Sequence, residues 1–575
     1  MFLTFSDWLV LGAILILPLV IGAIYYRRAG TSLDQYFLSG RELPWWLAGT
    51  SMVATTFAAD TPLAITGMVA LNGIAGNWLW WNAGLGSMLT VFFFARLWRR
   101  AGILTDLEFV EVRYSGRPAA LLRGLRALYL GLPVNCLIIG WVNLAMAKVL
   151  SITLGWHRLT AVILGLTATG CYASLSGLRG VVVTDFFQFL LAIFGTVALA
   201  YFALSLPEIG GLDGLQAKLP ESTFRLVPMV GSDQNSEIQA FALPVAAFMA
   251  YLSVQWWASW YPGQEPGGGG YVAQRIMSAR DEKNSLLATL WFTVAHYCIR
   301  PWPWIIVALV SIVLYPEIAD RESGYVLVMR DHLPAGWRGM LVGSFFAAYM
   351  STVSTQLNWG TSYLVNDVYA RFIKPDAVQS ELITVSRVIT LVVMALSAVV
   401  TFSLESVRQA WEYILESGAG IGLVLILRWY WWRITATSEI AALVAAASGF
   451  VFIRIFTEIQ FPETLLYLVP WTTVCWLVAT FLTPPEPTDH LVAFYRRVWP
   501  GGPGWRRVAS LSGAPTAQPL RALWLNWIAG CTMLYGALFA VGSALFRSTS
   551  DALFWFAVAA VGAGSLYRNL RTQEG

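Results

Sequence analysis

The feature that most constrains this chain is a repeated apolar segment of about 20 residues, the length that a helix needs to cross the hydrocarbon core of a bilayer. Only 12% of the 575 residues are charged and the mean hydropathy is +0.61. That is about half the charge of a soluble domain, too little to cover a water-exposed surface. We therefore expect an all-α polytopic membrane protein with about 15 transmembrane helices. The expected spans are approximately 5–26, 45–72, 78–97, 125–151, 159–176, 182–206, 240–260, 286–315, 338–364, 384–403, 409–428, 437–456, 464–482, 522–546 and 551–567.

Charge and cysteine usage exclude several classes of protein. The net charge is only +4 and the basic residues are dispersed, so no nucleic-acid partner is expected. The five cysteines are far apart and form no C-x-x-C pair, which fits small buried hydrophobic residues rather than a disulfide framework or a zinc site.

The flanking charges predict how the chain lies in the cell membrane. Asp7 precedes the first span and Arg27 and Arg28 follow it, and no signal-peptide cleavage site is present. With the N-terminus outside, about 26 of the 37 Lys and Arg residues fall in inner loops, as the positive-inside rule requires. An odd number of spans then leaves the C-terminus in the cytoplasm.

The second span contains a candidate helix break. Thr55 and Thr56 are followed by Asp60 and by Pro62, which cannot donate to the helix ladder. A break here frees backbone carbonyls at mid-membrane depth, where they are tolerated only against protein or a watery cavity. The alternative is a proline kink whose hydroxyls bond the preceding turn, but an idle Asp60 carboxylate is costly at that depth.

The ninth span carries two adjoining polar faces. At helical spacing, Ser351, Ser354 and Thr355 share one face, and Ala348, Ser351 and Thr352 share the next. Hydroxyl and carbonyl oxygens in this arrangement suit a hard cation. Small residues that allow close helix packing are the other interpretation.

Two further segments stand out. Asp185 begins about one turn inside the sixth span, where it could pair with Arg179 or give a negative charge to a cation held by hydroxyls. Two prolines and five glycines between 260 and 275 make a continuous helix unlikely, so this segment is either a cytoplasmic loop or a second helix interruption. Paired interruptions in corresponding halves are typical of a transporter binding site.

At these residues the chain resembles the sodium:solute symporter family over about residues 5–456. The motifs that carry the resemblance, in family order, are 36–41 (YFLSGR) with 43–46 (LPWW), 106–109 (DLEF) with Arg113 and Tyr114, 177–179 (GLR) with Thr184 and Asp185, Gln274-Arg275, 350–352 (MST) and 366–369 (NDVY). The resemblance implies a leucine-transporter-like core of five plus five helices in inverted repeats, with extra helices at both ends, and alternating access around a central site.

The implied segments follow the expected spans. They are an extra helix and cytoplasmic loop (1–44), a first repeat (45–206), an extracellular loop (207–239), a second repeat (240–436), two additional helices (437–482), a cytoplasmic linker (483–521), and two C-terminal helices with a tail (522–575).

The resemblance also implies where one or two Na⁺ ions bind. The principal site uses the carbonyls of Ala54 and Phe57 on the broken span, the Ala348 carbonyl, and the Ser351 and Thr352 hydroxyls. Some members hold a second ion, at positions that match Asp185, Ser351, Ser354 and Thr355. Ser351 would therefore touch both ions.

The resemblance implies the solute-binding residues less directly than the sodium ligands. In the sugar carriers an acid and an amide follow the helix break; here Asp60 matches the acid and Thr61 replaces the amide. The candidate solute-binding residues are Thr56, Asp60, Thr61, Gln255, Trp257, Tyr271 and Glu416. Asp60 and Glu416 could serve a polyol, an amino acid or an organic cation, and a monocarboxylate is less favoured near Asp60.

The function expected from this pattern is sodium-coupled symport of a small polar organic solute. A membrane solute sensor without net transport is the alternative, although no signalling domain is present in the sequence. An intramembrane enzyme is disfavoured: His296 and Arg300 are the only close basic pair within a span, and no nucleophile is evident beside them. The sequence does not determine the solute or the oligomeric state.

Overall fold

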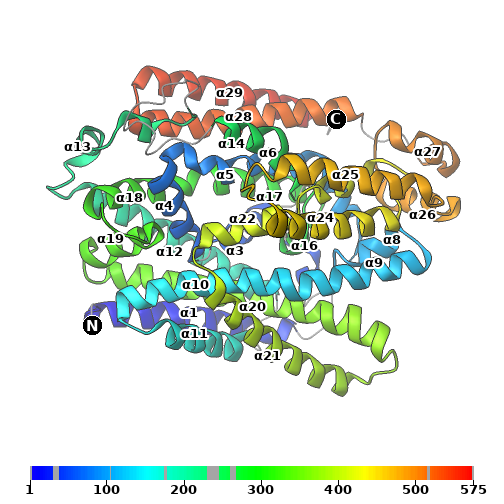
Figure 1. The fold of residues 1–575 in the computed structure, drawn as a ribbon, viewed down its shortest axis with the longest axis horizontal. Helices are drawn as coiled ribbons and strands as arrows, with labels where there is room; N and C mark the ends of the chain where they lie inside the picture. Colours follow the sequence, from blue (N-terminus) through cyan, green and yellow to red (C-terminus); the bar gives the residue numbers. More distant parts are fainter. Residues whose placement is uncertain are drawn as a thin grey trace.

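Figure 1 shows the computed structural model of the chain, in which most long helices lie side by side along one direction. The structure describes residues 3–29, 38–57, 59–103, 105–173, 178–228, 245–259, 267–514 and 519–572. No strand occurs in these ranges, which confirms the all-α fold class.

The first third of the chain is divided into short and long helices. They are α1 (Phe5–Ala29), α3 (Trp45–Thr55), α4 (Asp60–Asn72), α5 (Trp78–Trp81), α6 (Ala83–Leu89), η3 (Thr90–Phe94), α7 (Ala95–Ala101), α8 (Glu108–Arg113), α9 (Gly116–Tyr129), η4 (Leu130–Val134), α10 (Asn135–Leu154), α11 (Arg158–Ala173) and α12 (Leu178–Leu204).

The next part begins with the short helix α13 and ends with a second bent pair of helices. It comprises α13 (Gly211–Lys218), α14 (Val245–Ala250), η7 (Tyr251–Gln255), α15 (Trp256–Ala258), α16 (Gly270–Ser278), α17 (Glu282–Val294), η8 (Ala295–Ile299), α18 (Pro301–Leu314), α19 (Gly324–His332), α20 (Trp337–Ser362), η10 (Tyr363–Ile373), α21 (Gln379–Ser403), α22 (Val407–Ser417) and α23 (Ile421–Tyr430). The last part comprises α24 (Ala436–Phe456), α25 (Leu465–Leu482), α26 (Thr488–Val498), α27 (Arg506–Ser512), α28 (Leu520–Phe546) and α29 (Thr549–Thr572).

Fewer helices qualify as membrane spans than the sequence predicts. Within the described ranges, eight helices are long and apolar enough to cross a bilayer, or up to ten if each of two bent pairs counts as one span. The expected number of 15 is therefore not confirmed. One reason is that some helices are rich in polar residues: α20, with six Ser and Thr residues from Ser351 to Ser362, does not reach the hydropathy of a plain span.

The predicted break in the second span is present. Helix α3 ends at Thr55 and α4 begins at Asp60, and the two helix axes differ by 62°. Pro62 lies in the first turn of α4, where its missing N–H would have no intrahelical partner in any case. The proline thus starts the second half-helix instead of kinking a continuous one.

The expected eleventh span, 409–428, is also broken. Helices α22 and α23 meet at 53° around Gly418–Gly420. Gly420 has φ +86°, and its N–H donates to the Ala258 carbonyl at 2.9 Å. The end of α15 and the break between α22 and α23 are therefore in contact. The expected interruption at 260–275 is described only in part: α15 ends at Ala258 and α16 begins at Gly270, and residues 260–266 lie outside the described ranges.

The broken helix lies inside the bundle, and the C-terminal helices lie on one side of it. Helix α3 packs against α12, α16 and α17, and α1 and α12 pack against α20. Helices α28 and α29 form a hairpin along one edge of the molecule, at the top of Figure 1. Tyr535 of α28 donates to the Trp81 carbonyl at 2.7 Å, and Trp527 donates to the Leu85 carbonyl at 3.0 Å.

The predicted cytoplasmic linker is partly helical and packs against the bundle. Arg497 of α26 donates to the Ala101 carbonyl at 2.7 Å, and Trp505 donates to the Trp429 carbonyl at 2.7 Å. Trp505 is buried and stacks on Phe494. This segment therefore joins the end of α7 to the end of α23.

The contact at Gly420 predicts a stability defect. A Cβ at this position would lie 2.5 Å from Thr472 Cβ, and a side chain disfavours the left-handed backbone by about 1–2 kcal/mol. We expect Gly420→Ala to lower the midpoint of thermal unfolding in detergent by several degrees. Gly564→Ala is the control: it lies in α29 with nothing within 4 Å, so its midpoint should stay equal or rise. Equal midpoints for the two variants would contradict this packing.

Candidate functional site

The break between α3 and α4 lies directly against α20. The Phe57 ring stacks on Phe345 of α20, with ring centres 6.2 Å apart, and contacts Trp304 of α18 at 5.4 Å. Phe345 is one helical turn before Ala348, so the end of α3 lies close to the polar part of α20. The Ala54 carbonyl accepts the Phe57 N–H at 2.9 Å and still has a second lone pair.

The hydroxyls of α20 have different partners. Ser351 donates to Asp185 Oδ1 at 3.2 Å, and Ser354 donates to the Ser351 carbonyl at 3.1 Å. The buried Thr352 Oγ1 has no hydrogen-bond partner among the described residues. A buried hydroxyl without a partner costs free energy unless something absent from the protein chain satisfies it, so Thr352 points to a ligand. Thr355 is half-buried, and no hydrogen bond joins it to Asp185 in the described ranges.

Asp185 of α12 connects four helices. Its side chain is only 1% exposed. Ser51 of α3 donates to Oδ2 at 2.7 Å, and Arg275 Nη2 of α16 lies 3.9 Å from the same oxygen. Thr55 also reaches Oδ2, at 3.5 Å. Because Ser351 bonds Oδ1, one carboxylate joins α3, α12, α16 and α20.

Sequence reasoning missed part of this cluster. Ser51 and Thr55 are spaced i, i+4 on the same span as the break, a signal comparable to the one used for α20. Arg275 is part of a family motif, but the sequence carries nothing that pairs it with a residue 90 positions earlier. A pairing of Asp185 with Arg179 lies outside the described residues, because the Arg179 side chain is not described.

A pocket lies between α5, α10, α15 and α22, with an empty volume of about 580 Å³ that includes the space at its mouth. Four of its eleven lining residues are tryptophans: Trp80, Trp141, Trp256 and Trp411. None of these described lining residues is ionisable.

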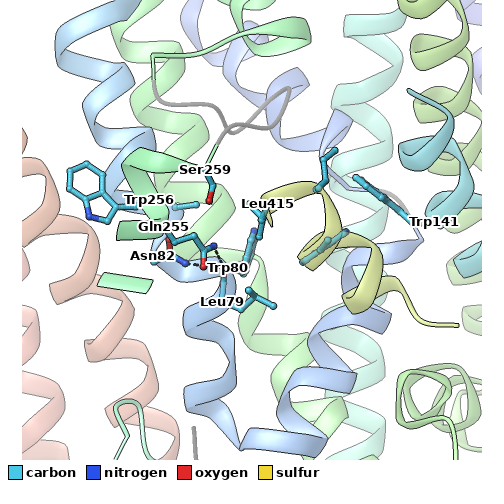
Figure 2. Close-up of a pocket in the computed structure, with 11 residues that line it drawn as sticks. Leu79, Trp80, Asn82, Trp141, Gln255, Trp256, Ser259 and Leu415 are labelled. Atoms are coloured by element: carbon cyan, nitrogen blue, oxygen red, sulfur yellow. Dashed lines mark hydrogen bonds between the residues drawn. The ribbon is translucent and has the colours of Figure 1, made fainter. Parts of the chain in front are cut away.

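The polar groups of the pocket are mainly unpaired acceptors. Figure 2 shows Asn82 and Gln255 next to each other, with Ser259 nearby. Their amide N–H groups are used: Gln255 donates to the Leu79 carbonyl at 3.0 Å, and Asn82 donates to the Trp78 carbonyl at 2.7 Å. Asn82 Oδ1, Gln255 Oε1 and Ser259 Oγ are buried without a hydrogen-bond partner in the described part of the chain. The pocket therefore offers oxygens to a ligand that donates hydrogen bonds.

Among the solute-binding candidates, only Gln255 lines this pocket. Trp257 donates to the Ser253 carbonyl at 2.7 Å, and Tyr271 is buried on α16. Glu416 is fully buried and forms an ion pair with Arg454 of α24. Its charge is thus used between helices, which the sequence could not show because the two residues are 38 positions apart.

The other three candidates belong to the helix break. The Thr56 hydroxyl donates to the Val53 carbonyl at 2.7 Å, and the Thr61 hydroxyl donates to the Thr56 carbonyl at 3.3 Å. Asp60 is buried and accepts a hydrogen bond from the indole of Trp141, a lining residue of the pocket. These residues lie beside the pocket, so a direct solute contact stays a prediction for each of them.

The family whose sequence pattern matches this chain is the sodium:solute symporter family, over residues 36–446. The chain belongs to that family. The sodium/glucose cotransporter of Vibrio parahaemolyticus is 25% identical over 500 residues, which cover 82% of this chain and 89% of the relative. The sodium/mannose cotransporter of Bos taurus is 24% identical over 498 residues, covering 81% and 77%.

The fold agrees with this membership. A solved structure of a Na⁺-coupled sialic acid symporter, in a substrate-bound outward-open state, superposes with a TM-score of 0.64 at 19% identity. It covers 84% of this chain and 99% of that symporter. The protein is thus a multi-pass membrane transporter of the leucine-transporter-like class, and the predicted family and fold are confirmed.

The Asp185–Arg275 pair predicts a specific pattern of stability. Asp185→Asn leaves the buried Arg275 guanidinium without its countercharge, which typically costs about 3–5 kcal/mol. We expect the double variant Asp185→Asn/Arg275→Gln to lose less free energy of unfolding than the two single losses added together. Circular dichroism in detergent micelles with increasing SDS measures this.

The control for this experiment is Asp376→Asn, on the exposed segment after η10, which should change stability by less than about 0.5 kcal/mol. If the double variant loses as much free energy of unfolding as the two single variants together, the two groups do not act as a pair.

Proposed function

We propose that this chain is a sodium-coupled symporter that takes up a small polar organic solute by alternating access. The observation that carries the proposal is the Thr352 hydroxyl, buried without a partner in the described ranges, on the helix that faces the break. Membership of the family supports sodium as the coupling ion. Each Na⁺ that enters at 100 mV contributes about 2.3 kcal/mol from the electrical term alone.

The principal sodium site would use two main-chain oxygens from the break and three groups from α20: the Ala54, Phe57 and Ala348 carbonyls and the Ser351 and Thr352 hydroxyls. The packing of Phe57 on Phe345 supports this set, because it holds the end of α3 against the polar turn of α20. An all-oxygen donor set suits Na⁺, a hard cation. No acidic ligand is needed for a single positive charge.

A second ion would lie at Asp185, with Ser351, Ser354 and Thr355. The Ser351–Asp185 hydrogen bond supports half of this set. Arg275 places a positive charge beside the same carboxylate, so an ion there would bind against a neighbouring guanidinium. We therefore propose the second site as the weaker of the two.

The pocket favours an uncharged, hydroxyl-bearing solute among the three classes that the sequence leaves open. Its unpaired groups are acceptor oxygens, and the described lining residues include no acid that would balance an amine or a quaternary ammonium. Tryptophan rings present apolar faces for the C–H side of such a molecule. The relatives named for glucose and mannose handle solutes of this kind.

The first test is uptake into proteoliposomes with an imposed sodium, potassium or proton gradient. We expect accumulation of a neutral polyol or sugar, from a panel that also contains amino acids and quaternary amines, only with sodium directed inward. Accumulation driven by protons alone would contradict sodium coupling. Sodium-dependent binding without accumulation would instead support the sensor.

The second test separates the two hydroxyls of α20. Because Ser351 bonds Asp185 and is a proposed ligand of both ions, whereas Ser354 bonds its own helix, Ser351→Ala should raise the sodium concentration for half-maximal uptake about tenfold, and Ser354→Ala less than threefold. Sodium-activation curves measured in the same proteoliposomes give both values. Overlapping curves for the two variants would refute the shared role of Ser351.

A further inference from the structure

A buried arginine lies at the helix break, and neither the sodium site nor the pocket lining includes it. Arg300 is 0% exposed and follows η8, one turn after the buried His296. Both side chains reach Thr56: Arg300 Nη1 donates to its hydroxyl at 3.1 Å, and His296 Nδ1 lies 3.0 Å from it. The basic pair that the sequence shows without a role therefore meets the end of α3.

Arg300 is a second donor to a carbonyl at the break, which also accepts the Thr56 hydroxyl. The last carbonyls of a helix have no intrahelical N–H partner, and at membrane depth no water is available to replace one. Arg300 Nη1 donates to the Val53 carbonyl at 3.1 Å. A positive charge at the C-terminal end of a helix is also favourable for the helix dipole.

The guanidinium is held in place from several sides. Its central carbon lies 5.0 Å from the centre of the Trp304 ring and 5.7 Å from that of Trp80. The Phe57 ring is 5.9 Å away, so the residue that would offer a carbonyl to sodium also packs on this cation. Aromatic faces attract a cation most strongly when it is removed from water.

Asp60 connects the same charge to the other half of the break. This buried carboxylate lies in the first turn of α4, where the helix dipole favours an anion, and it interacts electrostatically with Arg300. Arg300 therefore contacts the end of α3 and is countered by the start of α4. The two charges of opposite sign therefore lie one on each side of the break.

We propose that Arg300, countered by Asp60, is a positioning residue for the sodium site. Val53 directly precedes Ala54, and Phe57 directly follows Thr56, so each of the two groups bonded by Arg300 is next to a residue that would supply a main-chain sodium ligand. Fixing Val53 and Thr56 holds the Ala54 and Phe57 carbonyls close to their bound positions before the ion arrives. This inference rests on the proposed sodium-coupled function.

The same pair extends to the pocket. Trp80 and Trp141 line the pocket; Trp80 lies against Arg300, and Trp141 donates to Asp60. The Arg300–Asp60 pair is therefore in contact with both proposed binding regions. Because Asp60 is countered by Arg300, it acts here as part of this pair and not as the countercharge of a cationic solute.

Sodium itself is the probe that tests this inference. The full chain is purified in detergent, and its thermal unfolding is followed while NaCl replaces KCl at constant ionic strength, since an ion that binds only the folded state raises its stability. We expect Arg300→Gln to raise the sodium concentration for half-maximal stabilisation about tenfold. Asp60→Asn should do the same, and the double variant should shift it about tenfold and not a hundredfold, because the two groups act as one unit.

Arg158 is the matched control. It also donates to carbonyls at a helix end, those of Thr401 in the last turn of α21 and of Leu404 after it, and it lies over the Phe402 ring. None of these contacts is to the break between α3 and α4. Arg158→Gln should lower the unfolding temperature. It should leave the sodium concentration for half-maximal stabilisation within twofold of the parent value. If Arg300→Gln does not fold, Arg300→Lys keeps the charge without the planar fork and should give an intermediate shift.

The outcomes separate the inference from the function on which it rests. The positioning role is overturned if Arg300→Gln changes the sodium concentration for half-maximal stabilisation by less than threefold. It is also overturned if the shifts of the two single variants multiply in the double variant. Either result leaves sodium coupling intact. A parent protein that sodium does not stabilise beyond potassium contradicts the sodium assignment and this inference together.

Discussion

The structure depends on one interrupted helix that is held inside the bundle. Breaking a span at membrane depth exposes carbonyls that lipid cannot satisfy, so neighbouring helices must supply partners for them. Here Thr61 bonds the Thr56 carbonyl, and Arg300 bonds the Val53 carbonyl. The Ala54 and Phe57 carbonyls, next to these bonds, are the main-chain oxygens that we propose for sodium. The protein itself therefore stabilises the break on both sides of the proposed site.

The buried charged side chains likewise have partners within the protein. Asp185 forms an ion pair with Arg275 and Glu416 forms one with Arg454, and Asp60 interacts electrostatically with Arg300. Each pair joins helices that are distant in sequence, and a lone charge in any of these places would be strongly unfavourable. The pocket differs, since its polar groups are neutral acceptors. Ionic groups join helices, and the groups that we propose for the solute are uncharged.

The peripheral helices support this centre. Helix α28 bonds the Trp81 and Leu85 carbonyls, next to the residues of α5 and α6 that line the pocket. The second break, at Gly420, contacts the end of α15, which carries residues of the same pocket. Two interrupted segments and the C-terminal hairpin therefore surround one central region, in keeping with a transporter whose binding site lies at helix interruptions.

The sequence by itself determined the class of this protein: apolar segments of bilayer length require helices, and Pro62 after two threonines and an acid predicts the break between α3 and α4. It also predicted the polar faces of α20, because helical spacing is local information. Only the tertiary structure decided which groups meet. Arg275 and Arg300 reach Asp185 and the α3 break across about 90 to 250 positions, and no periodicity encodes such pairings. The second bend at Gly420 was missed for the same reason: its left-handed backbone is stabilised by a hydrogen bond to Ala258, a contact that exists only once the helices have packed.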